Sequence, residues 1–121
     1  MQEGRPILVV DDDPDMRRIV AELLEVAGYP VETATDGIQA LQTFDRLRPS
    51  LLLTDLHMPN LDGEALASLL HQRGFDPPIV IMTGTTRTPE QIRDAIGADA
   101  CLSKPFDPDA LLEMVERLRV P

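Results

Sequence analysis

Short apolar runs recur along the chain, separated by longer stretches in which apolar positions return every three or four residues. The runs are rich in β-branched residues and leucine, and they show little alternation with polar residues, which favours strands buried on both faces. We predict five such strands, at Ile7–Val10, Val31–Ala34, Leu51–Leu53, Ile79–Met82 and Cys101–Leu102.

Helical spacing fills the intervals between these predicted strands. In the first interval, apolar residues at helical spacing lie between Pro14, suited to a first helical turn, and Gly28, suited to end a helix. Asp13 is expected to cap this helix. Three further helices are predicted to follow Gly37, Gly63 and Asp107, the last of which is a candidate cap.

Strands therefore alternate with helices along the chain, including a short helix expected between Thr85 and Gly97. This order indicates an α/β fold: a doubly wound, five-stranded parallel sheet with helices on both faces, the flavodoxin-like (βα)5 arrangement. In such sheets, ligands bind beyond the carboxyl ends of the strands. The residues that directly follow each strand are the first candidates for function.

Polar residues occupy these strand ends. They are Asp11, Asp12, Asp13, Thr54, Asp55, Thr83, Ser103 and Lys104. Carboxylate oxygens without a cluster of His or Cys favour a hard cation, and Mg²⁺ suits one or two carboxylates with open positions for phosphate. One Mg²⁺ and the ammonium of Lys104 would balance the charges of Asp11, Asp12 and Asp55.

A carboxylate beside Mg²⁺, a lysine and a threonine hydroxyl is a plausible phosphoryl acceptor, because the cations neutralise the oxygens of the transferred group. Asp55 directly follows a buried apolar run, where a solvated charge is hard to explain. Asp55 is therefore the predicted acceptor, with Thr83 and Lys104 as its partners. Asp11 and Asp12 could also serve only as helix caps.

Four segments of the chain carry a family resemblance. They read "ILVVDDDPDMRRIV", "LLLTDLHMPNLDGEAL", "IVIMTG" and "CLSKPF". Together, and in this order, they resemble the receiver domain of two-component response regulators, and the first segment is similar to stand-alone chemotaxis receivers. The resemblance covers essentially the whole chain.

The resemblance implies a phosphorylation-dependent signalling switch in a phosphorelay, not an enzyme with a separate substrate. Asp55 would accept a phosphoryl group from a sensor histidine kinase or a histidine phosphotransfer protein. It further implies that Mg²⁺ is held by Asp12 and Asp55 directly, by Asp11 through water and by the backbone carbonyl of His57. Thr83 and Lys104 would then bind the phosphoryl oxygens.

Two local features add to this resemblance. The Lys104–Pro105 peptide bond would be cis in the family. Cys101 stands where many receivers carry tyrosine or phenylalanine, and it offers no aromatic ring for the usual relay from the threonine. The output of this chain is expected to use another face.

Composition narrows the class of protein. The 121 residues fit one domain, expected to be a single receiver domain over 1–121 without an output domain. The formal net charge of −10 disfavours direct binding to nucleic acid or an anionic membrane. One cysteine and no apolar N-terminal segment predict a cytoplasmic protein. A downstream protein target, or an output domain absent from this chain, would receive the signal.

Two other functions fit parts of the sequence. The stretch "ILVVDDDPD" also satisfies the pattern of haloacid-dehalogenase-type phosphatases, with Asp11 as nucleophile and Asp13 as general acid. The acidic pair that such enzymes use for Mg²⁺ has no counterpart, and Asp55 is left unexplained. A receiver that only docks partners and never carries phosphate is the second alternative. The sequence does not separate a stand-alone protein from a piece of a longer regulator or hybrid kinase.

Overall fold

The computed structural model of the chain describes residues 5–58, 60–84, 91, 98–104 and 106–118. Its elements in chain order are β1 (Ile7–Val10), α1 (Pro14–Val26), β2 (Val31–Ala34), α2 (Gly37–Leu47), β3 (Leu51–Asp55), α3 (Gly63–Gln72), β4 (Ile79–Thr83), β5 (Ala100–Ser103) and α5 (Pro108–Leu118). The helix expected between Thr85 and Gly97 lies outside the described residues, Gln91 apart, and so does Pro105 of the expected cis bond.

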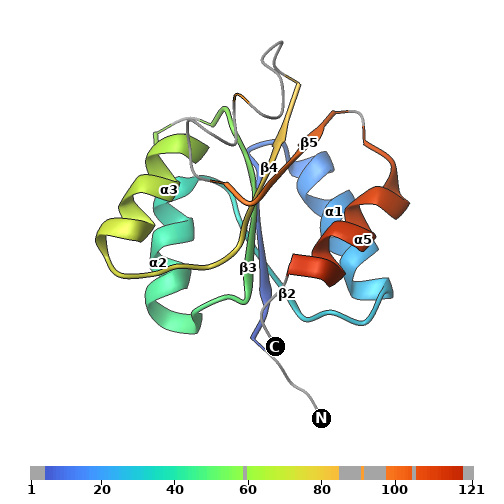
Figure 1. Cartoon of the computed structure of the whole chain (residues 1–121), viewed down its shortest axis with the longest axis horizontal. Helices are drawn as coiled ribbons and strands as arrows, with labels where there is room; N and C mark the ends of the chain where they lie inside the picture. The colour runs from blue at the N-terminus through green and yellow to red at the C-terminus, as the bar shows by residue number, and fades with distance from the viewer. Residues whose placement is uncertain (1–4, 59, 85–90, 92–97, 105, 119–121) are drawn as a thin grey trace.

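The five strands form one parallel sheet in the order β2-β1-β3-β4-β5. Figure 1 views this sheet nearly edge-on, with helices on both of its sides. This confirms the predicted doubly wound fold. Because β1 lies between β2 and β3, the chain changes its direction of winding there, and this switch point is where such sheets bind ligands. In the register of β1 and β3, Val10 lies opposite Thr54. The residues that follow, Asp11 and Asp55, are therefore neighbours across the sheet.

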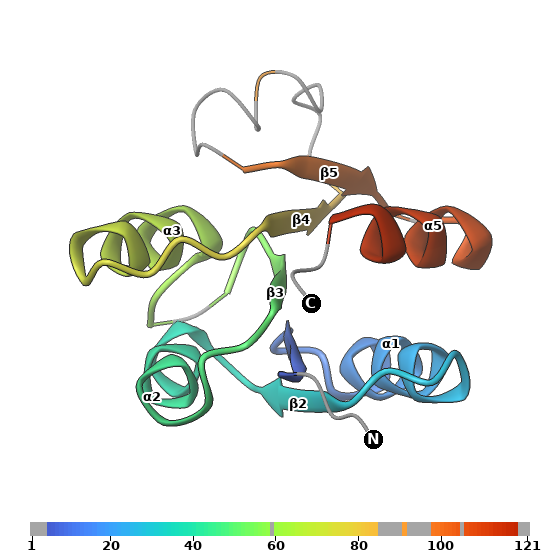
Figure 2. The ribbon, with the colours of Figure 1, turned by 60° about the horizontal axis from the view of Figure 1, so that its bottom comes forward.

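Two helix layers cover the sheet, with α2 and α3 on one face and α1 and α5 on the other (Figure 2). Successive residues of each central strand point into different layers, as strand geometry requires. Leu52 packs in the core beneath α2 and α3, whereas Leu53 packs in the core beneath α1 and α5. Both are fully buried. This is why the central strands read as unbroken apolar runs.

The first helix begins and ends as its sequence predicts. Pro14 occupies its first turn, and the side chain of Asp13 accepts a hydrogen bond from the Asp15 N–H at 3.0 Å. Gly28, just beyond the helix, has a φ of +98°, which a side chain would disfavour. The expected cap at Asp13 is thus confirmed. None of the described helices has the length and apolar character needed to cross a membrane.

The strands β3 and β4 are longer than their apolar runs. β3 continues through Thr54 to Asp55, and β4 continues to Thr83, because both ends stay in register: Asp55 lies opposite Met82. Interior strands of this sheet have ladder partners on both sides, so polar residues at their ends remain hydrogen-bonded. The candidate acceptor is consequently held by the sheet itself, not by a loop.

Candidate functional site

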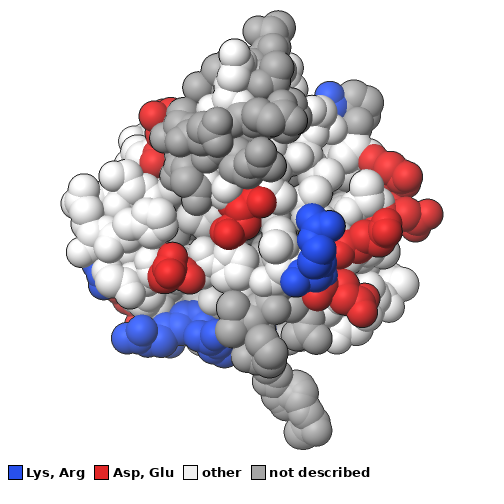
Figure 3. Space-filling view, in the orientation of Figure 1, with Lys and Arg blue, Asp and Glu red and all other residues white. Residues whose placement is uncertain are grey.

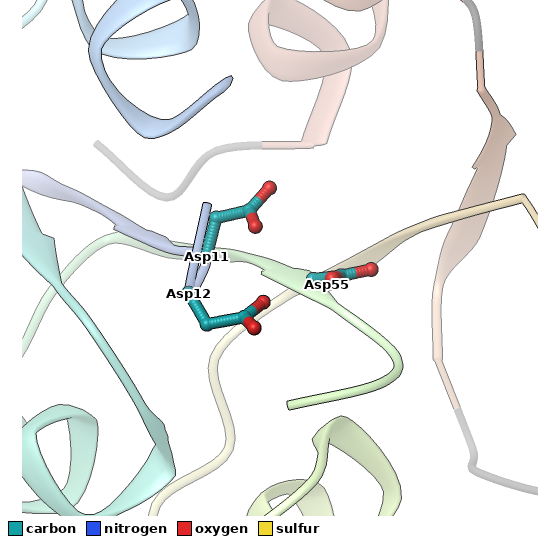
Figure 4. Close-up of side chains that lie close together, drawn as sticks. All are labelled: Asp11, Asp12 and Asp55. Atoms are coloured by element: carbon teal, nitrogen blue, oxygen red, sulfur yellow. The ribbon is translucent and has the colours of Figure 1, made fainter. Parts of the chain in front are cut away.

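Three carboxylates converge at the carboxyl ends of β1 and β3. Asp11, Asp12 and Asp55 each offer an oxygen, and these oxygens all lie within 4.8 Å of one another (Figure 4). In the close-up, the three side chains point toward a common space. Asp11 is buried, Asp55 is partly buried and Asp12 is exposed. The sequence predicted this cluster from the strand ends alone.

Asp11 is the most constrained of the three. It is 0% exposed. One of its carboxylate oxygens accepts the Asp13 N–H at 3.0 Å, and the other accepts the Lys104 ammonium at 3.3 Å. A carboxylate whose two oxygens are both engaged is poorly placed to attack a substrate, so the arrangement does not favour the phosphatase alternative with Asp11 as nucleophile.

Lys104 connects two of the carboxylates. Its Nζ lies 3.3 Å from Asp11 Oδ2 and 3.4 Å from Asp55 Oδ1. The backbone N–H of Lys104 donates to the carbonyl of Thr83 at 2.8 Å, which fixes the end of β5 beside the end of β4. Thr83 itself is buried. The predicted lysine and threonine are thus positioned together, and the lysine reaches Asp55.

The surroundings of Asp55 disfavour its charged form. Burial raises the pKa of its carboxyl group above the usual value, the ammonium of Lys104 lowers it, and the negative charge of Asp11 raises it again. The net direction is upward. The ammonium of Lys104 therefore does not offset burial and the neighbouring carboxylate together, and an added cation would stabilise the charged form of Asp55.

A pH series is expected to reveal the raised pKa of Asp55 as a change in stability. Because the pKa of Asp55 is raised, its contribution to stability is fully present below the unfolded value of 3.8 and is lost as the pH rises through the folded value. In chelator-treated buffer at neutral pH, Asp55→Asn should therefore have a larger free energy of unfolding than the wild type. The difference should narrow as the pH falls, measured by urea denaturation. A difference independent of pH would contradict this account.

Arg17 is a site residue that the sequence did not indicate. From the second turn of α1, its guanidinium donates to the backbone carbonyl of Asp11 at 2.8 Å. The contact fastens the strand-to-helix turn that carries Asp11 and Asp12, and it brings a positive charge to the edge of the cluster. Long helical side chains point toward the N-terminus of their helix. That direction is the one signal in the sequence that could have suggested this contact.

The loop after Asp55 is held at both ends. The N–H of Gly63 donates to the carbonyl of Leu56 at 2.9 Å, and a Cβ at Gly63 would lie 2.7 Å from the carbonyl oxygen of Asp55. Asn60, with a φ of +70°, donates from its side chain to Asp36 at 3.2 Å. Asp36 also caps α2 by accepting the Gln39 N–H at 2.9 Å. The loop is therefore tied to α2.

Removing this tie is expected to cost stability in two separable parts. Asp36→Ala removes both the helix cap and the contact with Asn60, and should lower the free energy of unfolding by about 1–2 kcal/mol. Asn60→Gly removes only the tie and also relieves the positive φ, so its cost should be below about 1 kcal/mol. Thermal and urea unfolding would measure both. Equal losses in the two variants would show that the cap contributes nothing.

The remaining predicted residue, His57, lies in the loop two residues beyond Asp55, with an exposed side chain. The role expected of its backbone carbonyl stays a prediction. The chemistry of the cluster fits a hard divalent cation, because the donors are oxygens and one of them, Asp12, is free to reorient from an exposed position. The cluster could hold a metal ion.

The fold and this acid cluster define a class of protein, the doubly wound α/β domains with an acidic cluster at the switch point of the sheet, and comparison with known proteins gives the family. Residues 7–116 match the model of the response regulator receiver domain, and the chain belongs to this family. It is 40% identical over 118 residues to the sensor histidine kinase RcsC of Salmonella typhi and 42% identical over 115 residues to the response regulator MprA of Mycobacterium leprae. Each match covers 93% of the chain, but only 12% and 49% of the relative.

Solved receiver structures align with this chain over nearly its whole length. The chemotaxis response regulator CheY4 of Vibrio cholerae aligns with a TM-score of 0.86 and 34% identity, covering 96% of this chain and 99% of that one. The receiver domain of the Francisella response regulator 1452 aligns with a TM-score of 0.87 and 29% identity, covering 95% and 96%. The chain is thus similar in length to a complete receiver structure and spans about half, or less, of the curated relatives.

Proposed function

We propose that this chain is a phosphorylation-controlled signalling switch in which Asp55 accepts a phosphoryl group. The observation that carries the proposal is the ammonium of Lys104 within 3.4 Å of Asp55 and 3.3 Å of Asp11. Asp55 ends an interior strand and is only partly buried, so it combines a fixed position with access. Of the three clustered carboxylates, it is the one suited to act as nucleophile.

The proposed transfer is an in-line displacement. One carboxylate oxygen of Asp55 attacks the phosphorus of a phosphohistidine as the bond from phosphorus to nitrogen breaks. The bonding electron pair leaves with the imidazole nitrogen, which takes up a proton. The products are an acyl phosphate on Asp55 and a neutral histidine on the donor. Lys104 and the Thr83 hydroxyl would contact the phosphoryl oxygens.

Mg²⁺ is the cofactor that we propose for this site. Asp12 and Asp55 would hold it directly, Asp11 through water, and the His57 carbonyl would complete the protein ligands. When bound, the metal supplies positive charge for the transferred oxygens. Asp11 stays fixed by its two hydrogen bonds and keeps Lys104 in place. Asp12 is proposed as a direct ligand and Asp11 as a ligand through water, because the exposed Asp12 can move toward a metal more readily than the buried Asp11.

The phosphoryl donor is proposed to be a sensor histidine kinase or a histidine phosphotransfer protein. A partner surface lies beside the site: α1 begins next to the acid cluster and exposes Ile19 and Val26, which are 47% and 90% accessible. These residues and Leu23 share one side of the helix, at the spacing through which helices pack on other helices. A helical partner docked along this side of α1 would have one end beside the acid cluster, where α1 begins.

The whole chain, 1–121, is proposed to form one receiver domain that works in the cytoplasm, with the activity of a switch and no separate substrate. Its relatives carry such a domain both within a sensor kinase and within a regulator of about twice its length. The signal would pass to a protein target or to an output domain. With a net charge of −10, direct binding to nucleic acid or an anionic membrane is not proposed.

Mass spectrometry after incubation with acetyl phosphate tests the proposal. The intact protein should gain one phosphoryl group in Mg²⁺ and none after chelation. Reduction of the acyl phosphate with borohydride should then place homoserine at position 55 in a peptide map. If neither acetyl phosphate nor a beryllofluoride titration gives a Mg²⁺-dependent complex, the chain is instead a docking receiver that carries no phosphate.

A further inference from the structure

A second candidate site lies at the opposite end of the sheet from the acid cluster. It is a surface pocket of about 230 Å³ between the C-terminal ends of α2 and α3 and the beginnings of β3 and β4. Arg5 and Arg48 are part of its lining, and we call it the arginine-rimmed pocket. Its full lining is Arg5, Phe44, Arg48, Pro49, Ser50, Gly74, Phe75, Asp76 and Pro77.

The floor of this pocket is apolar and well ordered by packing. Phe44 is 1% exposed, and its ring contacts the ring of Phe75 with centroids 5.5 Å apart. Pro49 is buried beside them, and Phe75 and Pro77 are partly buried. Aromatic and proline surfaces of this kind accept an apolar side chain with little loss of their own conformational freedom.

Arg48 is held in position at the rim. It ends α2 with a φ of +50°, and its backbone N–H donates to the carbonyl of Phe44 at 3.2 Å. Its guanidinium lies 5.1 Å from the centre of the Phe75 ring. A guanidinium resting on an aromatic ring keeps its N–H edge available for a planar carboxylate. Among the described carboxylates, none forms an ion pair with Arg48 or Arg5.

The pocket carries positive charge in a chain that is acidic as a whole, with 11 Lys and Arg residues against 21 Asp and Glu residues. Arg73 at this end is paired with Asp45 at 2.9 Å, so the positive charge available to a ligand is that of Arg5 and Arg48. Figure 3 shows positive side chains gathered at the lower left, over the end of α2. Asp76 lines the mouth, but its side chain is 96% exposed and faces solvent.

We propose that the arginine-rimmed pocket binds an acidic peptide segment of a partner protein, with a carboxylate on Arg48 and Arg5 and a bulky apolar side chain on the floor. In this complex the guanidinium groups would bind the planar carboxylates, and the phenylalanine and proline surfaces of the floor would pack against the apolar side chain. A free phosphate would leave the apolar floor exposed. The rest of the acidic surface repels such a peptide, which directs it to this end.

An NMR titration of the full chain tests this inference. The probe is an acetylated and amidated peptide, Asp-Glu-Leu-Phe-Glu-Asp, added to millimolar concentration. Saturable shifts are expected at the backbone amides of residues 44–48, 50 and 73–76, and none at those of residues 11–13. Arg48→Asn should weaken binding at least about tenfold, which corresponds to roughly 1.4 kcal/mol. Asparagine tolerates a positive φ, so this variant should keep its fold.

The controls separate specific binding from general charge attraction. Arg18→Gln removes an exposed arginine elsewhere, on α1, and should leave the affinity unchanged. A peptide with alanines in place of Leu-Phe should bind at least about tenfold more weakly. The proposal is overturned if the peptide causes no shifts, if Arg18→Gln weakens binding as much as Arg48→Asn, or if inorganic phosphate saturates the same amides. Binding to anionic vesicles but not to the peptide would overturn it equally.

Discussion

Asp55→Asn is expected to abolish phosphoryl uptake from acetyl phosphate, by roughly 100-fold or more, because the amide lacks the nucleophilic carboxylate oxygen. The substitution keeps the size of the side chain, so the sheet register that pairs Asp55 with Met82 should be retained. Intact mass spectrometry over a time course measures the effect. Chemical shifts of residues outside the site should stay as in the wild type.

Two further variants make this first result specific. Asp109→Asn removes an exposed carboxylate in the first turn of α5 that is not one of the three clustered carboxylates, and should take up phosphate at the wild-type rate. Asp12→Asn should slow uptake, with partial recovery as Mg²⁺ is raised, because a metal ligand and not the nucleophile is lost. If Asp55→Asn took up a phosphoryl group at the wild-type rate on another residue, Asp55 would not be the acceptor.

Gly63→Ala is expected to lower the free energy of unfolding more than Asp36→Ala or Asn60→Gly. A Cβ at this position would lie 2.7 Å from the carbonyl oxygen of Asp55 and 3.2 Å from the Cα of Leu56. Both are backbone atoms of the strand end, so they can yield only by moving the acceptor. We expect a loss of about 2–3 kcal/mol in the free energy of unfolding, together with slower phosphoryl uptake.

Gly84→Ala is the matched control for this second prediction. It makes the same chemical change near the same edge of the sheet, but a Cβ there would meet no atom within 4 Å. Its free energy of unfolding should stay within about 0.5 kcal/mol of the wild type. Urea denaturation of both variants gives the comparison. If the two alanines cost the same, close contact with the backbone of Asp55 is not what Gly63 provides.

The fold was predictable because buried parallel strands carry an unmistakable pattern. Ile7–Val10 and Val31–Ala34 were predicted at their observed bounds, since apolar and β-branched residues make up most of each strand and turn residues follow. The polar ends of β3 and β4 were missed because apolar runs stop before the ladder does. The backbone hydrogen bonds between strands include Thr54 and Asp55, because they do not depend on the polarity of the side chains.

The sequence predicted which strand-end residues lie together at the site, but not the hydrogen bonds that hold the surrounding loops. Asp11, Asp55 and Lys104 could be brought together from the rule that strand ends share one edge of the sheet. The contacts of Arg17 with the carbonyl of Asp11 and of Asn60 with Asp36 depend on loop shape, including a positive φ at Asn60. No periodicity encodes such loop geometry, and the direction of helical side chains is only a weak signal for Arg17, so both contacts were missed.

Leu52 and Leu53 are neighbours in sequence, yet they belong to cores on opposite faces of the sheet. Substitutions in one core should therefore combine additively with substitutions in the other, since few side chains are shared between them. Selection can then remodel the α1 and α5 layer for a new partner while leaving the α2 and α3 layer untouched. Because the sheet separates the two cores, a substitution in one helix layer should leave the packing of the other layer unchanged.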